Sequence, residues 1–504
     1  MPIPLFNSVA SWFLKKRIHQ IELFIKYPHE VQQEVLHNLL DTAAQTHYGL
    51  QHEFKTIHDY TIFAKRIPLV RYEDIQADIE LSRNGVQNIF WPNAIKWFAK
   101  SSGTTNAKSK FIPVSPESLE KCHYKAVKDM LSLYFNNNIE SQLFTGKCLR
   151  LGGSSELYHN NTSYFGDLSA IIIDNMPFWA ELSSTPSQKT SLMSEWEGKM
   201  KAILNESIDE KVTSLAGVPS WMLVLLQKAL SQTNTKHIHE LWPQAEVYFH
   251  GGVNFEPYRK QYHALFPKPD FKYYEIFNAS EGFFAIQDQN DSSDLLLMLD
   301  YGIFYEFIPQ EEWESENPKT LPLWEVKLDT IYELVITTNG GLWRYRIGDA
   351  IRFTSLHPYR IRVSGRTKQH INVFGEELMM ENAEQALAKT ATHFQVQIID
   401  YTVGPIFMEG NKKGAHEWLI EFTTPPNDLS FFSAYLDREL QRVNSDYEAK
   451  RYKNMTLQAP KVQVAPKGLF YQWLESKKKL GGQHKVPRLS NSRVYLEELL
   501  GNRF

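Results

Sequence analysis

Strand-like and helical patterns alternate along the chain from about residue 140, and two of the apolar runs lead to paired glycines. The run Gln244–Phe249 leads to Gly251–Gly252, and the run Ile331–Thr338 leads to Gly340–Gly341. Short apolar runs that stop at turn residues indicate buried strands, and amphipathic segments between them indicate helices packed on a sheet. This alternation predicts a mixed α/β fold.

The chain is too long for one core, and its pattern changes near residue 365. With 504 residues it is expected to form two or more domains. After the change, a helical stretch over 377–392 is followed by short strands and by one long helix over 429–452, which Asp428 would cap. We therefore predict a large N-terminal domain over residues 1–365 and a small C-terminal α+β domain over residues 366–504.

Bulk composition narrows the class of protein. Hydrophobic residues make up 42% of the chain, and a net charge of −4 gives no electrostatic case for a nucleic-acid partner. The two cysteines, Cys122 and Cys148, are interpreted as core thiols in a reducing compartment. No membrane span or cleavable leader is found, and Phe6–Lys26 fits a helix packed on the main domain better than a membrane-surface helix. We expect a soluble, cytoplasmic protein.

A loop rich in hydrogen-bond donors follows the apolar run 95–100. Its hydroxyl, glycine and lysine residues are Ser101, Ser102, Gly103, Thr104, Thr105, Lys108, Ser109 and Lys110. Glycine lets backbone N–H groups turn toward one point, and hydroxyl and ammonium groups complete a cage for phosphate oxygens. On its own such a cluster is more often an ordinary loop, so its interpretation depends on three further segments.

Those three segments combine aromatic, acidic and basic residues. They are Phe277-Asn278-Ala279-Ser280-Glu281-Gly282, Tyr345-Arg346-Ile347-Gly348-Asp349 and Gly365-Arg366-Thr367-Lys368. Together they supply the groups that a nucleotide needs. An aromatic ring can stack on a base, adjacent hydroxyl and carboxylate oxygens suit Mg²⁺, a carboxylate can accept from ribose hydroxyls, and guanidinium groups can bind phosphate or sugar oxygens.

Each of these groups also has an ordinary structural interpretation. Glu281 beside Ser280 suits Mg²⁺, but Glu281 is equally compatible with a solvated loop carboxylate. Asp349 suits a ribose, but it can equally form a surface ion pair with Arg346. Taken singly, the structural interpretations are favoured, so the case for a nucleotide site depends on the order and spacing of all four segments.

In order and spacing the segments resemble the acyl-adenylate-forming (ANL) superfamily. Within it, the chain most resembles the auxin-responsive acyl acid-amido synthetases, plant enzymes that conjugate auxin and jasmonate to amino acids, and their bacterial relatives. The resemblance covers nearly the whole chain. The stretches that narrow it to this family are 101–105, 110–113, 217–221, 302–309 and 485–488.

The resemblance implies an ATP site with a Mg²⁺ ion. The residues that it assigns to the phosphates are Ser101, Ser102, Gly103, Thr104 and Thr105, with Lys110 nearby. The residues that it assigns to the adenine and its surroundings are Gly251, Gly252, Phe277, Asn278 and Ala279. Ser280 and Glu281 correspond to the metal- and phosphate-binding pair.

The resemblance also assigns residues to the ribose, to the hinge between the domains and to catalysis. Asp349 and Arg366 correspond to ribose-binding residues, and Lys368 falls at the hinge between the domains. Lys485 corresponds to the C-terminal lysine that stabilises the forming acyl-adenylate, so the implied catalytic residues are Lys485, Glu281 and Lys110. The implied fold is a large N-terminal acyl-adenylate-forming domain and a small C-terminal α+β lid.

Four positions depart from the pattern of the superfamily. Asn106 and Asn278 stand where glycine is usual, in the phosphate loop and in the second segment. Asn372 occupies a position often held by lysine, and His484 replaces the glycine before the C-terminal lysine. The departures affect the backbone geometry of the loop and the assignment of Lys485.

The resemblance implies a two-step ligase. A carboxylic acid would react with Mg-ATP to give acyl-AMP and pyrophosphate, and an amine, in the family's pattern an amino acid, would then displace AMP to form an amide. Two alternatives stay open: an acyl-CoA ligase that forms a thioester, and a non-catalytic nucleotide-binding relative. A P-loop NTPase, a Rossmann dehydrogenase and a zinc enzyme are disfavoured because their motifs are missing from the sequence.

Overall fold

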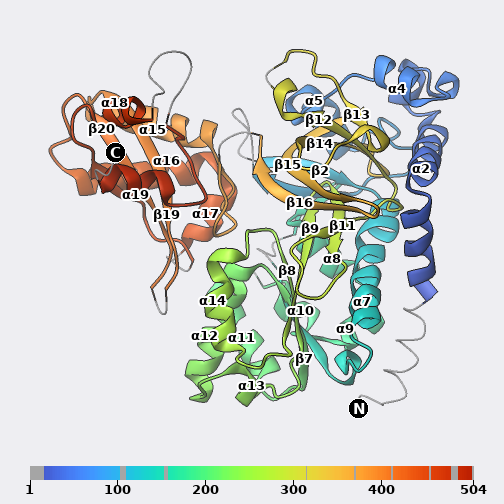
Figure 1. Cartoon of the computed structure of the whole chain (residues 1–504), viewed down its shortest axis with the longest axis horizontal. Coiled ribbons are helices and arrows are strands. Elements are labelled where there is room, and N and C mark those ends of the chain that lie inside the picture. The colour runs from blue at the N-terminus through green and yellow to red at the C-terminus, as the bar shows by residue number, and fades with distance from the viewer. Residues whose placement is uncertain are drawn as a thin grey trace. The chain divides into compact units, whose positions relative to one another are not determined.

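The computed structural model describes residues 16–102, 109–152, 157–176, 178–193, 195–313, 315–367, 370–409, 412–452, 456–477 and 486–501. It divides into two compact units (Figure 1). Unit 1 comprises Met1–Lys100, Phe111–Gly252 and His263–Thr367. Unit 2 comprises Ser101–Lys110, Val253–Tyr262 and Lys368–Phe504. The mixed α/β class predicted from the sequence is confirmed.

A twelve-stranded sheet organises unit 1. Its strands, in spatial order, are β13 (Leu321–Pro322), β12 (Ile303–Pro309), β14 (Ile331–Thr338), β15 (Tyr345–Leu356), β16 (Tyr359–Arg366), β11 (Leu295–Leu297), β10 (Gly282–Gln287), β9 (Lys272–Ala279), β8 (Val247–Gly251), β7 (Val212–Gly217), β3 (Lys147–Leu151) and β6 (Ser184–Thr185). From β6 to β9 the pairing is parallel, and from β9 to β13 it is antiparallel. The sheet therefore changes type at β9.

A smaller sheet has the order β2 (Ser109–Val114), β1 (Trp97–Ser102), β5 (Tyr164–Gly166) and β4 (Tyr158–His159). Helices surround the strands, and Figure 1 shows β7 and β8 between α12 on one side and α7 on the other. The longer helices that begin in unit 1 are α2 (Pro28–Ala43), α4 (Tyr60–Arg66), α5 (Tyr72–Arg83), α7 (Lys125–Asn137), α8 (Leu168–Asp174), α11 (Trp196–Ser207) and α12 (Pro219–Thr233). Short helices are α3 (His47–Gln51), α6 (Pro116–Ser118), α9 (Phe178–Leu182), α10 (Gln188–Ser191) and α13 (Ile238–Leu241), and α14 (Glu256–Leu265) spans the division between the units.

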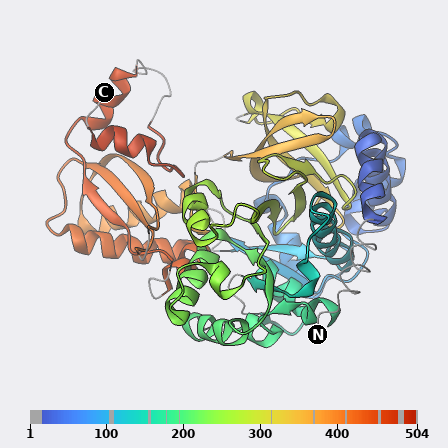
Figure 2. The same ribbon diagram turned by 60° about the horizontal axis from the view of Figure 1, so that its bottom comes forward.

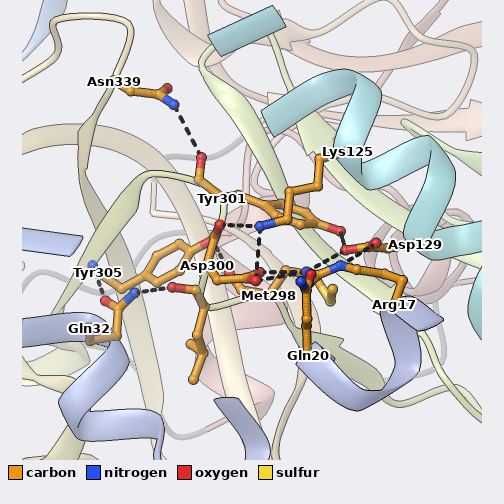
Figure 3. A network of polar contacts seen from close by, with 11 residues as sticks. Arg17, Gln20, Gln32, Lys125, Asp129, Met298, Asp300, Tyr301, Tyr305 and Asn339 are labelled. Carbon is orange, nitrogen blue, oxygen red and sulfur yellow. Dashed lines mark hydrogen bonds and ion pairs between the residues drawn. The ribbon is translucent and has the colours of Figure 1, made fainter. Parts of the chain in front are cut away.

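An ion-pair network attaches the helical residues 16–26 to the core of unit 1 (Figure 3). Arg17 Nε lies 2.7 Å from Asp129 Oδ1, and Arg17 Nη2 lies 2.8 Å from Asp300 Oδ2. Lys125 Nζ also lies 2.9 Å from Asp300 Oδ2, and the Tyr301 hydroxyl donates to Asp129. This part of the expected N-terminal helix is thus packed on the main unit. Within the described ranges, every helix is too short or too polar to reach across a bilayer.

A π-helical turn, Leu119–Tyr124, lies between α6 and α7 and buries two residues that are adjacent in the sequence. The Phe283 N–H donates to Cys122 Sγ at 3.2 Å, and burial raises the pKa of this thiol to about 12. His123 is fully enclosed, and burial lowers its pKa from 6.5 to about 4. Both cysteines of the chain are free thiols.

The low pKa of His123 predicts acid sensitivity. Between its ordinary pKa and its folded-state pKa, the unfolded chain binds a proton that the folded chain does not, so stability falls as pH falls. From about pH 7 to about pH 5 this one group is expected to lower the free energy of unfolding by about 2 kcal/mol. Urea unfolding of His123→Gln should show a pH dependence weaker by that amount. An unchanged dependence would contradict the buried neutral imidazole.

Unit 2 contains a three-stranded sheet with helices on both faces (Figure 2). Its strands β19 (Ile398–Ile406) and β20 (Ala415–Phe422) pair antiparallel, and β21 (Lys461–Val464) pairs parallel with β20. Leu419 packs in a cluster with residues of two helices, and Phe422 on the other face contacts Phe432. The helices are α15 (Met380–Phe394), α16 (Leu429–Val443), α17 (Ser445–Arg451), α18 (Leu469–Ser476) and α19 (Val494–Leu500).

The long helix predicted over 429–452 is wrong in one respect, because it is broken at Asn444. Asp428 caps the start as expected, with Oδ1 accepting the Phe431 N–H at 2.9 Å. Asn444 has extended backbone dihedrals, and its side chain accepts the Tyr447 N–H at 2.8 Å. A side chain that caps a new helix competes with continuation of the previous one, so two helices form.

Candidate functional site

The carboxyl ends of the parallel strands meet at one edge of the unit 1 sheet, which is where α/β sheets bind ligands. Gly251 ends β8 and lies opposite Ile276 of β9. A Cβ atom on Gly251 would lie 2.5 Å from the Ile276 carbonyl oxygen, so no larger residue fits there. Gly252 has a φ of +82°, in the left-handed region that favours glycine. The two glycines assigned to the adenine therefore stand beside the end of β9.

Strand β9 carries the second predicted segment to the same edge. Phe277 is nearly buried and its ring centroid lies 5.0 Å from that of Phe284. Asn278 and Ala279 complete the strand and are partly exposed. Ala279 pairs with Gly282, so the next two residues of the segment form a tight hairpin turn.

That turn consists of Ser280 and Glu281, which are both partly exposed. A hydroxyl and a carboxylate at adjacent positions supply two hard oxygen ligands. In the described part of the chain, no three His, Cys, Asp or Glu side chains are grouped to hold a metal ion. An ion at Glu281 would take its remaining ligands from hydroxyl, phosphate and water oxygens, as Mg²⁺ commonly does.

Asp349 and Arg366 face each other across β15 and β16. Arg366 Nε lies 3.1 Å from Asp349 Oδ1, and the Asp349 side chain is 10% exposed. The alternative pairing of Asp349 with Arg346 is wrong, because Arg346 binds Glu333 instead. Arg346 pairs with Val335 of β14, whereas Asp349 pairs with Arg366 of β16, and the chain bulges between Arg346 and Ala350.

Tyr345 lies on the same strand as Asp349, and sequence reasoning gave it no role of its own. Its side chain is fully buried at the start of β15. Burial raises the pKa of Tyr345 well above its ordinary value, the nearby Glu281 carboxylate raises it further, and the Arg366 guanidinium lowers it. The charges of Glu281 and Arg366 therefore both act on Tyr345, and Arg366 also pairs with Asp349. The sequence motif alone gave no sign that these charges act on its tyrosine.

Ser101, Ser102 and Lys110, the described residues among those assigned to the phosphates, belong to unit 2 by their contacts. Ser101 and Ser102 end β1, and Lys110 is the second residue of β2. Next to Lys110, the Ser109 hydroxyl donates to the Ser445 hydroxyl at 3.2 Å. The other residues assigned to the loop, hinge and C-terminal lysine lie outside the described residues: Gly103, Thr104, Thr105, Lys368 and Lys485.

Solved structures with the same fold are acyl-activating ligases. The GH3.15 acyl acid amido synthetase superposes with a TM-score of 0.61 at 18% identity, over 96% of this chain and 95% of that one. The 2-hydroxyisobutyryl-CoA ligase, solved with 2-HIB-AMP and CoA, superposes with a TM-score of 0.58 at 13% identity, over 95% of this chain and 93% of that one.

Curated relatives extend over nearly the whole chain. Indole-3-acetic acid-amido synthetase GH3.3 of Arabidopsis thaliana is 22% identical over 577 residues, covering 98% of this chain and 95% of that protein. Jasmonoyl--L-amino acid synthetase GH3.5 of Oryza sativa subsp. japonica is 23% identical over 572 residues, covering 95% of this chain and 96% of that protein. The resemblance stated from the sequence motifs is confirmed.

Three family models match consecutive parts of the chain. The GH3 family N-terminal domain matches residues 17–271, the GH3 family central domain matches residues 296–366, and the GH3 family C-terminal domain matches residues 381–494. These matches cover well over half of the sequence, and the chain therefore belongs to the GH3 family.

Proposed function

We propose that this protein is an ATP-dependent ligase that activates a carboxylic acid as acyl-AMP and transfers the acyl group to an amino acid, forming an amide. The observation that carries the proposal is the Asp349–Arg366 pair, together with Glu281 at the tip of the β9–β10 hairpin, in a GH3 chain. Two of the relatives described above are an indole-3-acetic acid-amido synthetase and a jasmonoyl-L-amino acid synthetase. Those relatives support the reaction class.

The nucleotide would be held by groups at the sheet edge, by the Asp349–Arg366 pair and by the turn at Ser280 and Glu281. Gly251 and Gly252 leave room for the adenine, and the Asp349–Arg366 pair supplies an acceptor and a donor for the ribose hydroxyls. Ser280 and Glu281 fit Mg²⁺, which when bound would neutralise charge on the phosphates. The residues proposed for the phosphates are Ser101, Ser102, Gly103, Thr104, Thr105 and Lys110.

The reaction would proceed in two balanced steps. A carboxylate oxygen of the acid bonds to the α-phosphorus of ATP, and the bond to pyrophosphate breaks. The amine nitrogen then bonds to the acyl carbon, loses a proton, and AMP leaves with the electron pair of the acyl–oxygen bond. Positioning and charge neutralisation dominate the first step, for which Lys485 is the proposed C-terminal cation. Residues 366–504 would form a lid that hinges at Lys368 and excludes water.

Acid-dependent exchange of pyrophosphate into ATP tests the first step. We expect exchange with at least one member of a panel of aromatic, fatty and keto acids, because acyl-AMP formation is reversible. Absence of exchange with every acid, while ATP binding is confirmed by calorimetry, would favour the non-catalytic alternative. The acid that supports exchange also identifies the acyl class.

The acceptor distinguishes the amide reaction from thioester formation, since both share acyl-AMP. With the active acid, each amino acid and coenzyme A should be supplied separately and the products identified by mass spectrometry. Amide with an amino acid and no thioester is the expected result. Thioester without amide would replace this proposal with the acyl-CoA ligase alternative, which the fold also accommodates.

A further inference from the structure

Arg150, near the end of β3, has two buried nitrogen atoms without a partner in the part of the chain that the structure describes. These atoms, Nε and Nη2, are covered from solvent and make no hydrogen bond with a described residue. Nη1 donates to the Met176 sulfur at 2.6 Å, and a thioether is a weak acceptor. Burial lowers the pKa of Arg150, while Cys148 and Glu181 raise it, and an arginine keeps its charge at neutral pH.

The two unpaired donors are the ones that bind carboxylates elsewhere in this protein. Arg17 places Nε 2.7 Å from Asp129 Oδ1 and Nη2 2.9 Å from Asp129 Oδ2. Arg360 binds Asp288 through the same two nitrogen atoms, at 2.9 and 2.7 Å. A buried charge without a partner is costly, so the same edge of Arg150 calls for an explanation. It fits a site whose anion is supplied by a ligand.

Arg150 lies near the edge of the sheet where ligands are proposed to bind. It stands beside Ala216 of β7, which in turn stands beside Phe249 of β8. Residues in register on parallel strands share one face of the sheet. The ring of Tyr134 in α7 packs on Phe249, with centroids 5.7 Å apart. Arg150 is therefore on the α7 face, one residue before β3 ends.

The distance along the edge separates Arg150 from the nucleotide. Gly251, which is proposed to leave room for the adenine, ends β8, two strands away from β3. Two strand spacings amount to about 10 Å. Among the described residues, Arg150 makes no polar contact with a group proposed for the nucleotide. The carboxylate that becomes acyl-AMP must meet ATP, so Arg150 is placed for another part of the acid.

We infer that Arg150 binds a second acidic group of the acyl substrate, which is therefore a dicarboxylic acid activated at its other carboxylate. Nε and Nη2 would donate two parallel hydrogen bonds to the carboxylate that does not react. The inference rests on the proposed function, because it describes the acid that the ligase activates. It makes Arg150 a substrate-binding residue that determines specificity.

Acid-dependent ATP–pyrophosphate exchange with matched acids tests this inference. Straight-chain dicarboxylic acids of six to twelve carbons are compared with monocarboxylic acids of the same lengths, and aromatic dicarboxylic acids with their monocarboxylic counterparts. We expect kcat/KM for at least one dicarboxylic acid to exceed that of its matched acid by about a hundredfold, because the matched acid leaves the guanidinium unpaired.

Arg150→Met removes the charge and keeps an unbranched apolar side chain. We expect this variant to lose about a hundredfold in kcat/KM for the dicarboxylic acid, mainly through a higher KM, and to retain its activity with the monocarboxylic acid. Arg150→Lys should recover only part of the preference, because an ammonium group lacks the two-donor edge. Urea unfolding of Arg150→Met without substrate should be unchanged or shifted to higher urea, because an unpaired buried charge is removed.

Arg352→Met is the matched control. Arg352 Nε is also buried without a partner in the described ranges, but Arg352 belongs to β15, in the antiparallel part of the sheet. This variant should keep the preference of the wild type for the dicarboxylic acid. Equal loss of that preference in Arg150→Met and Arg352→Met would overturn the inference.

The remaining outcomes separate this inference from the proposed function. Exchange with monocarboxylic acids and no preference for any dicarboxylic acid overturns the inference and leaves the proposed function standing. An equal loss with both kinds of acid in Arg150→Met assigns Arg150 to the fold or to the reacting carboxylate, and a destabilised Arg150→Met shows a structural role; each overturns the inference. Absence of exchange with every acid of either kind removes the proposed function, and the inference with it.

Discussion

Glu281→Ala and Asp349→Ala are each expected to reduce acid-dependent ATP–pyrophosphate exchange by about a hundredfold or more. Glu281 stands at the tip of the β9–β10 hairpin, where the proposed metal requires a carboxylate, and Asp349 supplies the acceptor for the ribose. Loss of either group removes electrostatic stabilisation that acts on the bound nucleotide. Because Glu281 is partly exposed in a turn, its replacement should leave the far-UV circular dichroism and the unfolding transition intact.

An ion pair of equal burial in the same sheet controls for the loss of the Asp349–Arg366 contact. Arg360 Nη2 lies 2.7 Å from Asp288 Oδ2, and the Asp288 side chain is 9% exposed against 10% for Asp349. Asp288→Asn should therefore lose a similar amount of stability to Asp349→Asn but retain exchange activity. Full activity in both Glu281→Ala and Asp349→Ala would refute the site, whereas equal loss in Asp288→Asn and Asp349→Asn would assign the effect to folding.

Asp129→Ala is expected to lower the free energy of unfolding by about 3–5 kcal/mol, the usual cost of leaving one partner of a buried ion pair alone. Asp129 is fully buried and accepts from both Arg17 and Tyr301. Among the described residues, its removal leaves the nearly buried Arg17 guanidinium with the shared Asp300 carboxylate as its one ionic partner. Urea unfolding followed by tryptophan fluorescence measures the loss.

The exposed pair of Arg362 and Asp294 provides the comparison for this prediction. Its atoms are 2.6 Å apart, but the two side chains are 46% and 25% exposed. Asp294→Asn should cost less than about 1 kcal/mol, because water screens and replaces the interaction. If Asp129→Ala cost no more than Asp294→Asn, the network in Figure 3 would not be what secures residues 16–26 to the core.

Much of the fold could be predicted because local patterns and the final structure agree. The apolar run before Gly251 is β8, and the run 331–338 is β14. The glycine after β8 has a local cause, since the positive φ of Gly252 favours glycine. Such constraints operate within a few residues, so they are visible in the sequence.

The errors and omissions come from contacts between distant residues. Whether Asp349 binds Arg346 or Arg366 depends on which strand pairs with β15. The partner strand β16 begins after the turn that ends β15, and its register places Arg366 opposite Asp349. The break at Asn444 depends on a cap whose side chain also donates to the Glu377 carbonyl, 67 residues away. Tyr345 forms an isolated bridge with Val70, 275 residues earlier in the chain, and no spacing rule reports that contact.

The π-helical turn before α7 lets the chain carry one extra residue without changing the rotational phase of that helix. A π-helix bonds each residue one position farther along than an α-helix, so the turn accommodates one additional residue. Deleting one residue from 119–124 would therefore let the turn return to α-helical bonding, with Asp129 still facing Arg17. The deletion would act on the turn itself, where Cys122 accepts the Phe283 N–H. The extra residue thus determines the contact of this turn with β10 and not the ion pair of Arg17.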